Sequence, residues 1–169
     1  IFVDGNNTYM YYATIDSNTN ESIWGVKLKS PYEVDLSTRK ELLRPGYLDS
    51  TFAESENVLV WENYRTELYS YSSINEAPFM VKSNGKYYLT YSVNGTWEKW
   101  YNVCYAVGNS PLGDFTKPYT KGQTWTNLLL GYPGDADLES DLANQWSGFS
   151  SGNAHHSFFY VGDQLMISY

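Results

Sequence analysis

PFMVKSNGKYYLTYS (78–92) reads as a complete β-hairpin, and it decides the fold of this sequence. An apolar strand leads into Asn84-Gly85, a dipeptide that supplies the positive φ angles of a tight turn, and a second strand follows. The segments IFVDGNNTYMYYA (1–13) and SFFYVGDQLMISY (157–169) repeat this pattern, with turns at Asp4-Gly5 and Gly162-Asp163. The three segments therefore predict equivalent hairpins of a repeated β-structure.

The spacing of these hairpins is regular. Their last aromatic residues, Tyr12, Tyr91 and Tyr169, lie 79 (91 − 12) and 78 (169 − 91) positions apart. Strand-like segments at 22–30 and 101–110 follow two of the hairpins. Repeated antiparallel units of this kind predict an all-β fold made of β-propeller blades. The alternative is a β-sandwich in which the hairpins resemble one another by accident.

The number of hairpins is too small for a closed ring. The smallest propellers have about four blades, so we expect 1–169 to form a single partial propeller domain of about three blades. The chain begins with IFVDG and ends with QLMISY, both inside strand patterns, which predicts a fragment of a longer protein. The period exceeds the roughly 40 to 50 residues of simple propeller repeats. Long connections are therefore expected, and long loops at a propeller mouth usually build the binding site.

The composition limits the possible partners. Aromatic residues make up 18% of the 169 residues, with 17 Tyr and 6 Trp, and such rings stack on sugars. The net charge is −8 and no Lys/Arg cluster is present, which argues against a nucleic acid partner. No run of about 18 apolar residues predicts a membrane span. Cys104 is the single cysteine, so there is no internal disulfide and no cysteine-based metal site.

Two polar residues occupy matching positions before the hairpins. Glu76 precedes Phe79 by three residues, and His155 precedes Phe158 by three. If the inner strands converge on a propeller axis, both side chains meet at one mouth. The matching position of the first repeat lies upstream of Ile1, so the pattern predicts a further functional residue there.

The chemistry of Glu76 suits a proton donor. Partial burial disfavours the charged form of a carboxyl group, and glycoside cleavage needs a protonated carboxyl paired with a second carboxylate. Pro78 would fix the backbone beside it. The alternative is a solvated residue at a strand end. His155 and His156 are adjacent, and neighbouring strand residues point to opposite faces, so at most one of them is expected to serve a site.

These segments carry a resemblance to a known family. INEAPFMVKSNGKYYLTYS (74–92) resembles the acid-bearing segment of glycoside hydrolase family 43, in which Glu-Gly-Pro precedes a hairpin. AVGNSPLGDF (106–115) looks like the family's next strand, and GNAHHSFFYVGDQLMISY (152–169) is similar to its G-x-G-H-x-S segment. IFVDGNNTYMYYA resembles the part that follows the family's Asp-Pro. The resemblance covers nearly the whole chain, in the right order.

The resemblance implies a secreted or periplasmic five-bladed propeller that hydrolyses arabinose- and xylose-containing polysaccharides with inversion. It assigns Glu76 as the general acid. It places His155 beside an axial calcium ion, held through water because calcium prefers oxygen ligands; a structural histidine without an ion is the alternative. The family's catalytic base and a second, acid-tuning Asp lie outside this chain. Asp4 is expected in the hairpin turn and matches neither.

Two positions depart from the family pattern. Ala77 replaces the Gly that follows the acid, which adds a methyl group facing the pocket. Asn153-Ala154 replaces a more glycine-rich approach to His155.

The remaining candidates have plainer alternatives. Trp61, Trp97 and Trp100 are candidate substrate-binding residues, although each could instead pack in the core or cap a blade. We expect Glu62 to be solvated. The alternating acidic residues of GDADLESDL (134–142) predict an exposed loop, because they lack the spacing of an EF-hand.

Two other functions stay open at this point. A retaining five-bladed fructan hydrolase or transferase also places a Glu acid ahead of a Pro, but it needs a nucleophilic Asp close to its acid. A propeller that binds glycans through Trp and Tyr faces would have no catalysis. For all three functions the expected partners are an oligosaccharide or polysaccharide and the remaining blades of the same protein.

Overall fold

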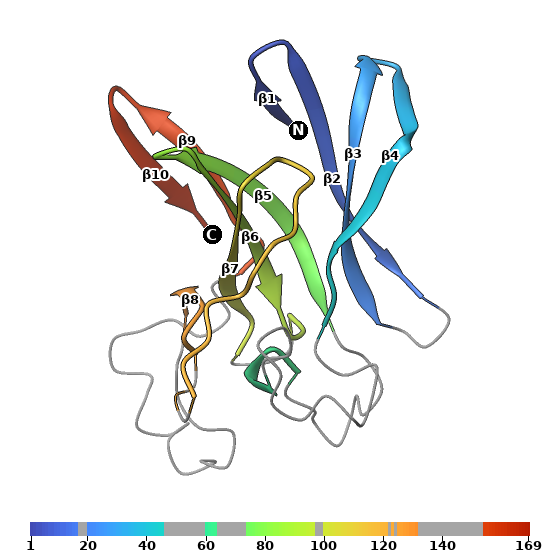
Figure 1. The fold of residues 1–169 in the computed structure, drawn as a ribbon. Helices are drawn as coiled ribbons and strands as arrows, with labels where there is room; N and C mark the ends of the chain where they lie inside the picture. The colour runs from blue at the N-terminus through green and yellow to red at the C-terminus, as the bar shows by residue number, and fades with distance from the viewer. Residues whose placement is uncertain are drawn as a thin grey trace.

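The protein is built from antiparallel strands arranged in three sheets (Figure 1). The computed structural model describes residues 1–16, 20–45, 60–63, 74–96, 100–121, 123, 125–131 and 154–169. The strands are β1 Phe2–Asp4, β2 Asn7–Ile15, β3 Glu21–Ser30, β4 Glu33–Leu43, β5 Asn75–Ser83, β6 Lys86–Val93, β7 Asn102–Gly108, β8 Leu128–Leu130, β9 Ser157–Val161 and β10 Gln164–Ser168. A short 3₁₀ helix, η1, spans Val60–Asn63.

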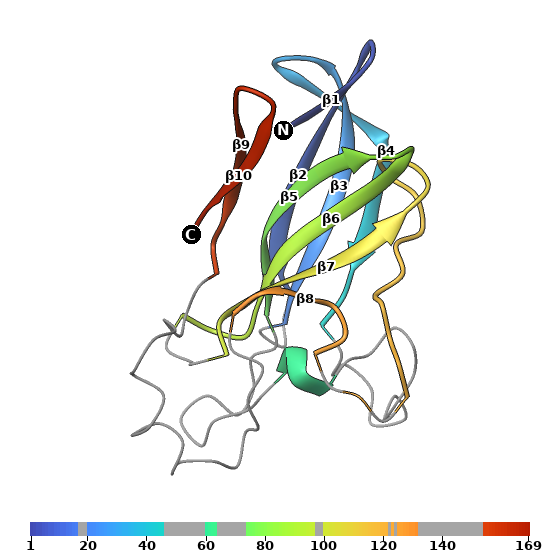
Figure 2. The same cartoon turned by 90° about the vertical axis from the view of Figure 1, so that its left-hand side faces the viewer.

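The sheets follow the chain in order. The first sheet runs β1-β2-β3-β4, the second β5-β6-β7-β8, and the third is the pair β9 and β10. Figures 1 and 2 show the three sheets standing side by side, with the hairpin turns gathered at one end. Up-and-down four-stranded sheets in this arrangement are what propeller blades require. In the described residues no helix is long and apolar enough to cross a membrane.

The hairpin turns follow the local chemistry of their residues, with one correction. Asn84 and Gly85 have φ angles of 49° and 74°, as the tight turn between β5 and β6 needs. In the first hairpin Asp4 ends β1 and pairs with Asn7, so Gly5 and Asn6 form the turn. The expectation that Asp4 lies in the turn was therefore wrong.

Asp4 instead links the first two sheets. Its carboxylate accepts hydrogen bonds from Lys82 Nζ at 2.7 Å and from the Tyr87 hydroxyl at 2.5 Å. The Lys82 hydrogen bond is the largest of the effects that lower the pKa of Asp4. At the other end of the same interface, Glu21 forms an isolated parallel bridge with Ile74. The interface between the two sheets is thus tied at both ends.

The main core lies between the first and second sheets. Ile23, Leu89 and Tyr91 are fully buried there. A methyl group on Gly25 would stand 2.7 Å from side-chain carbons of both Leu42 and Leu112, so a larger residue at this point would force these side chains to shift.

The third sheet meets the second through its aromatic residues. The rings of Phe79 and Phe158, the two positions aligned in the repeat, lie 5.5 Å apart. Much of this hairpin is exposed on both of its faces, and its large exposed side chains are Phe159, Tyr160, Val161, Leu165, Met166 and Tyr169.

Candidate active site

Glu76 lies where the edge of β5 is distorted. The register between β5 and β6 shifts between Glu76 and Phe79, which marks a β-bulge over Ala77 and Pro78. Ala77 has a φ of 48°, in the left-handed region that favours glycine. This backbone angle explains why the family pattern has Gly at this position. Pro78 fits here because a bulged residue gives up its ladder hydrogen bond.

Glu76, Tyr101 and His155 form a cluster at one end of the sheets. The Tyr101 hydroxyl donates to Glu76 Oε1 at 2.5 Å, and it lies 3.2 Å from His155 Nδ1. His155 Nδ1 itself is 4.0 Å from Glu76 Oε1. The repeat argument predicted that Glu76 and His155, which lie 79 positions apart, would meet, and these distances confirm it.

The surroundings of the cluster set its hydrogen-bond directions. Ser92 pairs with Glu76 across the β5–β6 ladder, and its Oγ accepts a hydrogen bond of 2.8 Å from the His155 backbone N–H. The Ser92 side chain also hydrogen-bonds to the Tyr101 hydroxyl. Burial, followed by the hydrogen bond to Glu76, raises the pKa of Tyr101 above its usual value. The phenol therefore keeps its proton at neutral pH and acts as a donor toward Glu76.

His155 is presented by an unusual backbone conformation. Its φ is 59°, and its side chain is 71% exposed in this chain, whereas that of Glu76 is 21% exposed. One side of the imidazole is thus open to solvent, and on the other side its Nδ1 faces the hydroxyl group of Tyr101. An exposed ring at this point is available to a ligand.

His156 has different surroundings from His155. It is buried, with Nε2 at 2.7 Å from Thr90 Oγ1. Thr90 donates its single hydroxyl proton to the carbonyl of Phe79 at 3.0 Å. His156 Nε2 is therefore the donor in its hydrogen bond with Thr90 Oγ1. Burial lowers the pKa of His156 to about 4, with the neighbouring His155 adding to the effect. His156 is therefore a neutral packing residue.

A second carboxylate lies near Glu76. Glu21 begins β3 and bridges to Ile74, two residues before Glu76. Burial raises the pKa of Glu21, and the charge of Glu76 raises it further. The sequence contained no signal for Glu21, because its position depends on how the first two sheets meet.

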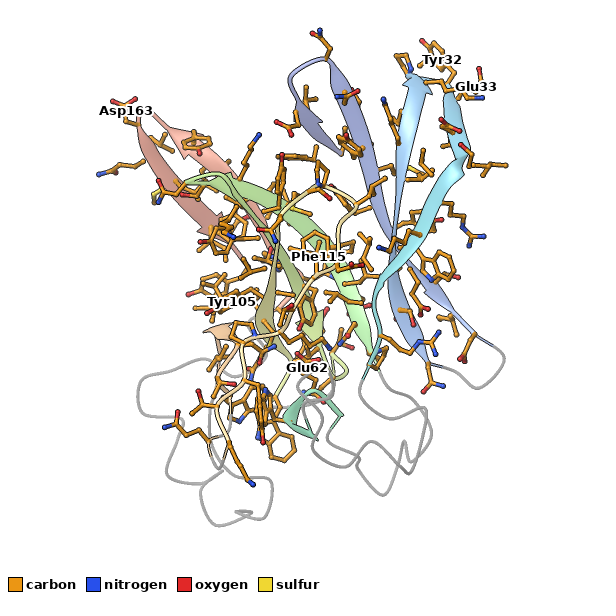
Figure 3. The ribbon with its side chains drawn as sticks, in the orientation of Figure 1. Tyr32, Glu33, Glu62, Tyr105, Phe115 and Asp163 are labelled. Carbon is orange, nitrogen blue, oxygen red and sulfur yellow. The ribbon has the colours of Figure 1, made fainter. Side chains whose placement is uncertain are left out.

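Glu62 and Lys117 form a buried ion pair near the start of β5. Glu62, on η1, is fully buried, and its Oε2 accepts a hydrogen bond from Lys117 Nζ. Its Oε1 accepts hydrogen bonds of 2.5 Å from both the Tyr91 hydroxyl and Asn127 Nδ2. The prediction that Glu62 is solvated was wrong, because the packing of distant segments encloses it. Figure 3 shows Glu62 beside η1, at the opposite end of the sheets from Tyr32 and Glu33.

Lys117 connects this network to the strand of Glu76. Its Nζ donates to Asn75 Oδ1 at 3.3 Å and to the carbonyl of Arg44 at 3.2 Å, and Asn75 directly precedes Glu76. Burial is the largest cause of the strongly raised pKa of Tyr91, and the negative charge of Glu62 adds to it. The network therefore links η1 and Lys117 to the start of β5.

Two of the three candidate sugar-binding tryptophans, Trp61 and Trp100, are buried. Trp61 is 3% exposed, and its Nε1 donates to Asn127 Oδ1 at 2.8 Å. Trp100 is 7% exposed and belongs to the same core. These positions favour the packing alternative for both residues. Trp97 lies outside the described residues, as do the acidic residues of 134–142.

The residues around His155 do not make a calcium site by themselves. In the described part of the chain, no group of three or more His, Cys, Asp or Glu side chains could hold a metal ion. Calcium takes six to eight oxygen ligands, and His155 offers one nitrogen that already contacts Tyr101. The calcium ion therefore stays a prediction, and no chemistry is derived from it.

Comparison with known proteins now identifies the family. Residues 1–127 match the family described as glycosyl hydrolases family 43. The chain belongs to this family. A β-xylosidase from Xylanibacter ruminicola is 51% identical over 41 residues, which make up 24% of this chain and 12% of that protein.

Solved structures support the fold of this family 43 chain. A thermostable family-43 glycoside hydrolase has a TM-score of 0.64 at 22% identity, over 98% of this chain and 45% of that one. An endo-1,4-β-xylanase from Bacteroides thetaiotaomicron has a TM-score of 0.57 at 22% identity, over 96% of this chain and 43% of that one. An α-L-arabinofuranosidase from Clostridium thermocellum has a TM-score of 0.52 at 18% identity, over 98% and 38%. The predicted fold class, an all-β partial propeller, is confirmed, and the chain spans less than half the length of these relatives.

Proposed function

We propose that this family 43 chain carries the general acid of a glycosidase that cleaves arabinose- and xylose-containing polysaccharides or oligosaccharides. Glu76 donates a proton to the glycosidic oxygen, and an Asp from a blade outside this chain activates water on the opposite face of the sugar. In an inverting enzyme the two carboxyl groups stand about 6.5 to 9.5 Å apart, which leaves room for that water. The observation that carries the proposal is the partly buried Glu76 carboxyl, held between Tyr101 and His155.

The surroundings of Glu76 suit an acid rather than a solvated surface residue. Its side chain is 21% exposed, so it is shielded but can still reach a ligand. Glu21 stands close enough for the two charges to interact.

The rest of the active site would come from blades outside this chain. The exposed apolar side chains of β9 and β10, such as Phe159 and Met166, form a face that a further blade would cover.

The test is Glu76→Gln in the protein with all of its blades. We expect hydrolysis of xylobiose or arabinobiose to fall at least about a hundredfold with sugar binding retained, because the amide cannot donate the proton. Glu33→Gln is the matched control, because Glu33 lies at the far tip of the first sheet (Figure 3). Undiminished turnover by Glu76→Gln would rule out this role. An anomer of retained configuration in the product, observed by NMR, would instead favour the retaining alternative.

A further inference from the structure

We propose that Tyr101 is a positioning residue that holds one oxygen of the Glu76 carboxyl group and leaves the other for the leaving group of the substrate. This inference rests on the proposed function of Glu76, which it deepens. It assigns a task to a residue that no sequence motif marks.

Both contacts to the Glu76 carboxyl group fall on the same oxygen. The hydrogen bond from Tyr101 and the approach of His155 both involve Oε1. Among the described residues no hydrogen bond to Oε2 is recorded, so Oε2 is the oxygen left to carry the proton to a substrate. A carboxyl group anchored through one oxygen cannot rotate freely about its last bond. Catalysis gains from such a fixed orientation.

Tyr101 is itself held firmly in place. The residue is 4% exposed and packs against Val103 and Ala154. It stands directly before β7, whose ladder to β6 begins at the next residue, Asn102. Its hydroxyl group is therefore held from both the backbone and the ring, and it can impose a position on Glu76.

The protons available in the cluster match the hydrogen bonds that it makes. Tyr101 has one hydroxyl proton and gives it to Glu76. Its oxygen can accept from Ser92 and, at 3.2 Å, from His155 when Nδ1 carries a proton. In this arrangement every donor has an acceptor, so the cluster has one preferred state while Glu76 is ionised. When Glu76 is protonated on Oε2, the hydrogen bond from Tyr101 to Oε1 persists.

The effect of Tyr101 on proton release has a definite sign. A hydrogen bond donated to a carboxylate favours the ionised form. Tyr101→Phe removes this donor, whereas Glu21 and His155 remain beside the carboxyl. The protonated acid then survives to higher pH, and the alkaline limb of the pH profile of kcat/KM moves upward.

The experiment compares two leaving groups in the protein with all of its blades. Departure of 4-nitrophenolate needs little protonation, whereas a sugar hydroxyl needs the acid. We expect Tyr101→Phe to lower kcat/KM about tenfold or more on xylobiose or arabinobiose. On the 4-nitrophenyl β-xyloside or α-arabinofuranoside we expect a loss below about threefold. The alkaline limb should rise by about half a pH unit or more.

Two variants provide controls. Tyr105→Phe removes a hydroxyl group from β7, the strand that directly follows Tyr101. Within the described part of the chain this hydroxyl makes no hydrogen bond, so the kinetics of the variant should match the wild type. If Tyr101→Phe does not fold, 3-fluorotyrosine at position 101 keeps the shape and strengthens the donor. It should move the alkaline limb downward.

The outcomes separate the two proposals. Equal losses on both leaving groups with an unmoved pH profile would make Tyr101 merely structural and overturn the inference. Wild-type kinetics of Tyr101→Phe, with Glu76→Gln inactive, would also overturn it and leave the proposed function intact. An active Glu76→Gln would remove the proposed function itself.

Discussion

Lys117 and Glu62 form an almost completely buried ion pair, and Lys117 contacts the start of the strand that carries Glu76. Their side chains are 3% and 0% exposed. Each has further partners, Asn75 for Lys117 and Tyr91 for Glu62. Buried charges are tolerated only when they are paired and their remaining hydrogen-bonding groups are satisfied. The pair therefore joins η1, the segment before β8 and the start of β5 into one unit.

Lys117→Met should destabilise the protein strongly, because it leaves the Glu62 carboxylate buried without a counterion. We expect a loss of about 3 to 5 kcal/mol in the free energy of unfolding, measured by chemical denaturation. Adding Glu62→Gln should restore part of this loss. Lys40→Met is the control, since its ion pair with Asp114 is exposed and should contribute little to stability. A Lys117→Met variant no less stable than Lys40→Met would contradict the assigned role.

Ala77→Gly should stabilise the protein. Ala77 has a φ of 48°, where an L-residue with a Cβ is strained by about 1 to 2 kcal/mol. Glycine relieves this strain but loses more backbone entropy on folding, so a net gain of up to about 1 kcal/mol in the free energy of unfolding is expected. Ala13→Gly in β2 is the matched control and should cost about 0.5 to 1 kcal/mol. Equal losses in the two variants would show that strain at Ala77 is negligible.

Local rules were sufficient to predict the hairpins and their meeting point. Turn dipeptides and strand patterns are short-range features, and the equal offsets of Glu76 and His155 from aligned Phe residues carried the geometry of the site. The same alignment did not predict burial. Tyr91 is fully buried between neighbouring sheets, whereas its counterpart Tyr169, directly after β10, is 64% exposed.

Long-range packing limited what could be predicted of the site. Glu62 and Lys117 lie 55 positions apart, and only the three-dimensional arrangement pairs them. Tyr101 reaches Glu76 because β7 is the second neighbour of β5 in the same sheet, a relation that its residue type does not reveal. A charged residue near a strand end is usually solvated, and this general tendency led to the prediction that Glu62 is exposed. The packing of Lys117 and other distant residues around Glu62 overrides it.

The stability of the protein should fall in mildly acidic solution through His156. Its pKa is lowered to about 4 in the folded protein, mainly by burial, whereas in the unfolded chain it is about 6.5. As the pH falls from about 6.5 toward 4, His156 binds a proton in the unfolded state but stays neutral in the folded state. The free energy of unfolding therefore decreases over this window.

His156→Gln tests this assignment, because glutamine keeps a donor for Thr90 but does not titrate. Between pH 6.5 and 4 the free energy of unfolding of the variant should fall less steeply than that of the wild type. The slopes should differ by at most about 1.4 kcal/mol per pH unit. Parallel curves would show that His156 is not the group responsible, whatever the absolute stability of the variant.

Glu21→Gln should produce the opposite pH dependence. Burial and then the charge of Glu76 raise the pKa of Glu21 in the folded state above its usual value of 4.5. Ionising Glu21 therefore opposes folding as the pH rises above about 4.5, and the penalty is complete above its raised folded pKa. The variant should melt at a higher temperature than the wild type at pH 7 and at nearly the same temperature at pH 4. Because part of the effect comes from Glu76, the gain at pH 7 should shrink when Glu21→Gln is combined with Glu76→Gln, and an undiminished gain would mean that the two carboxylates do not interact.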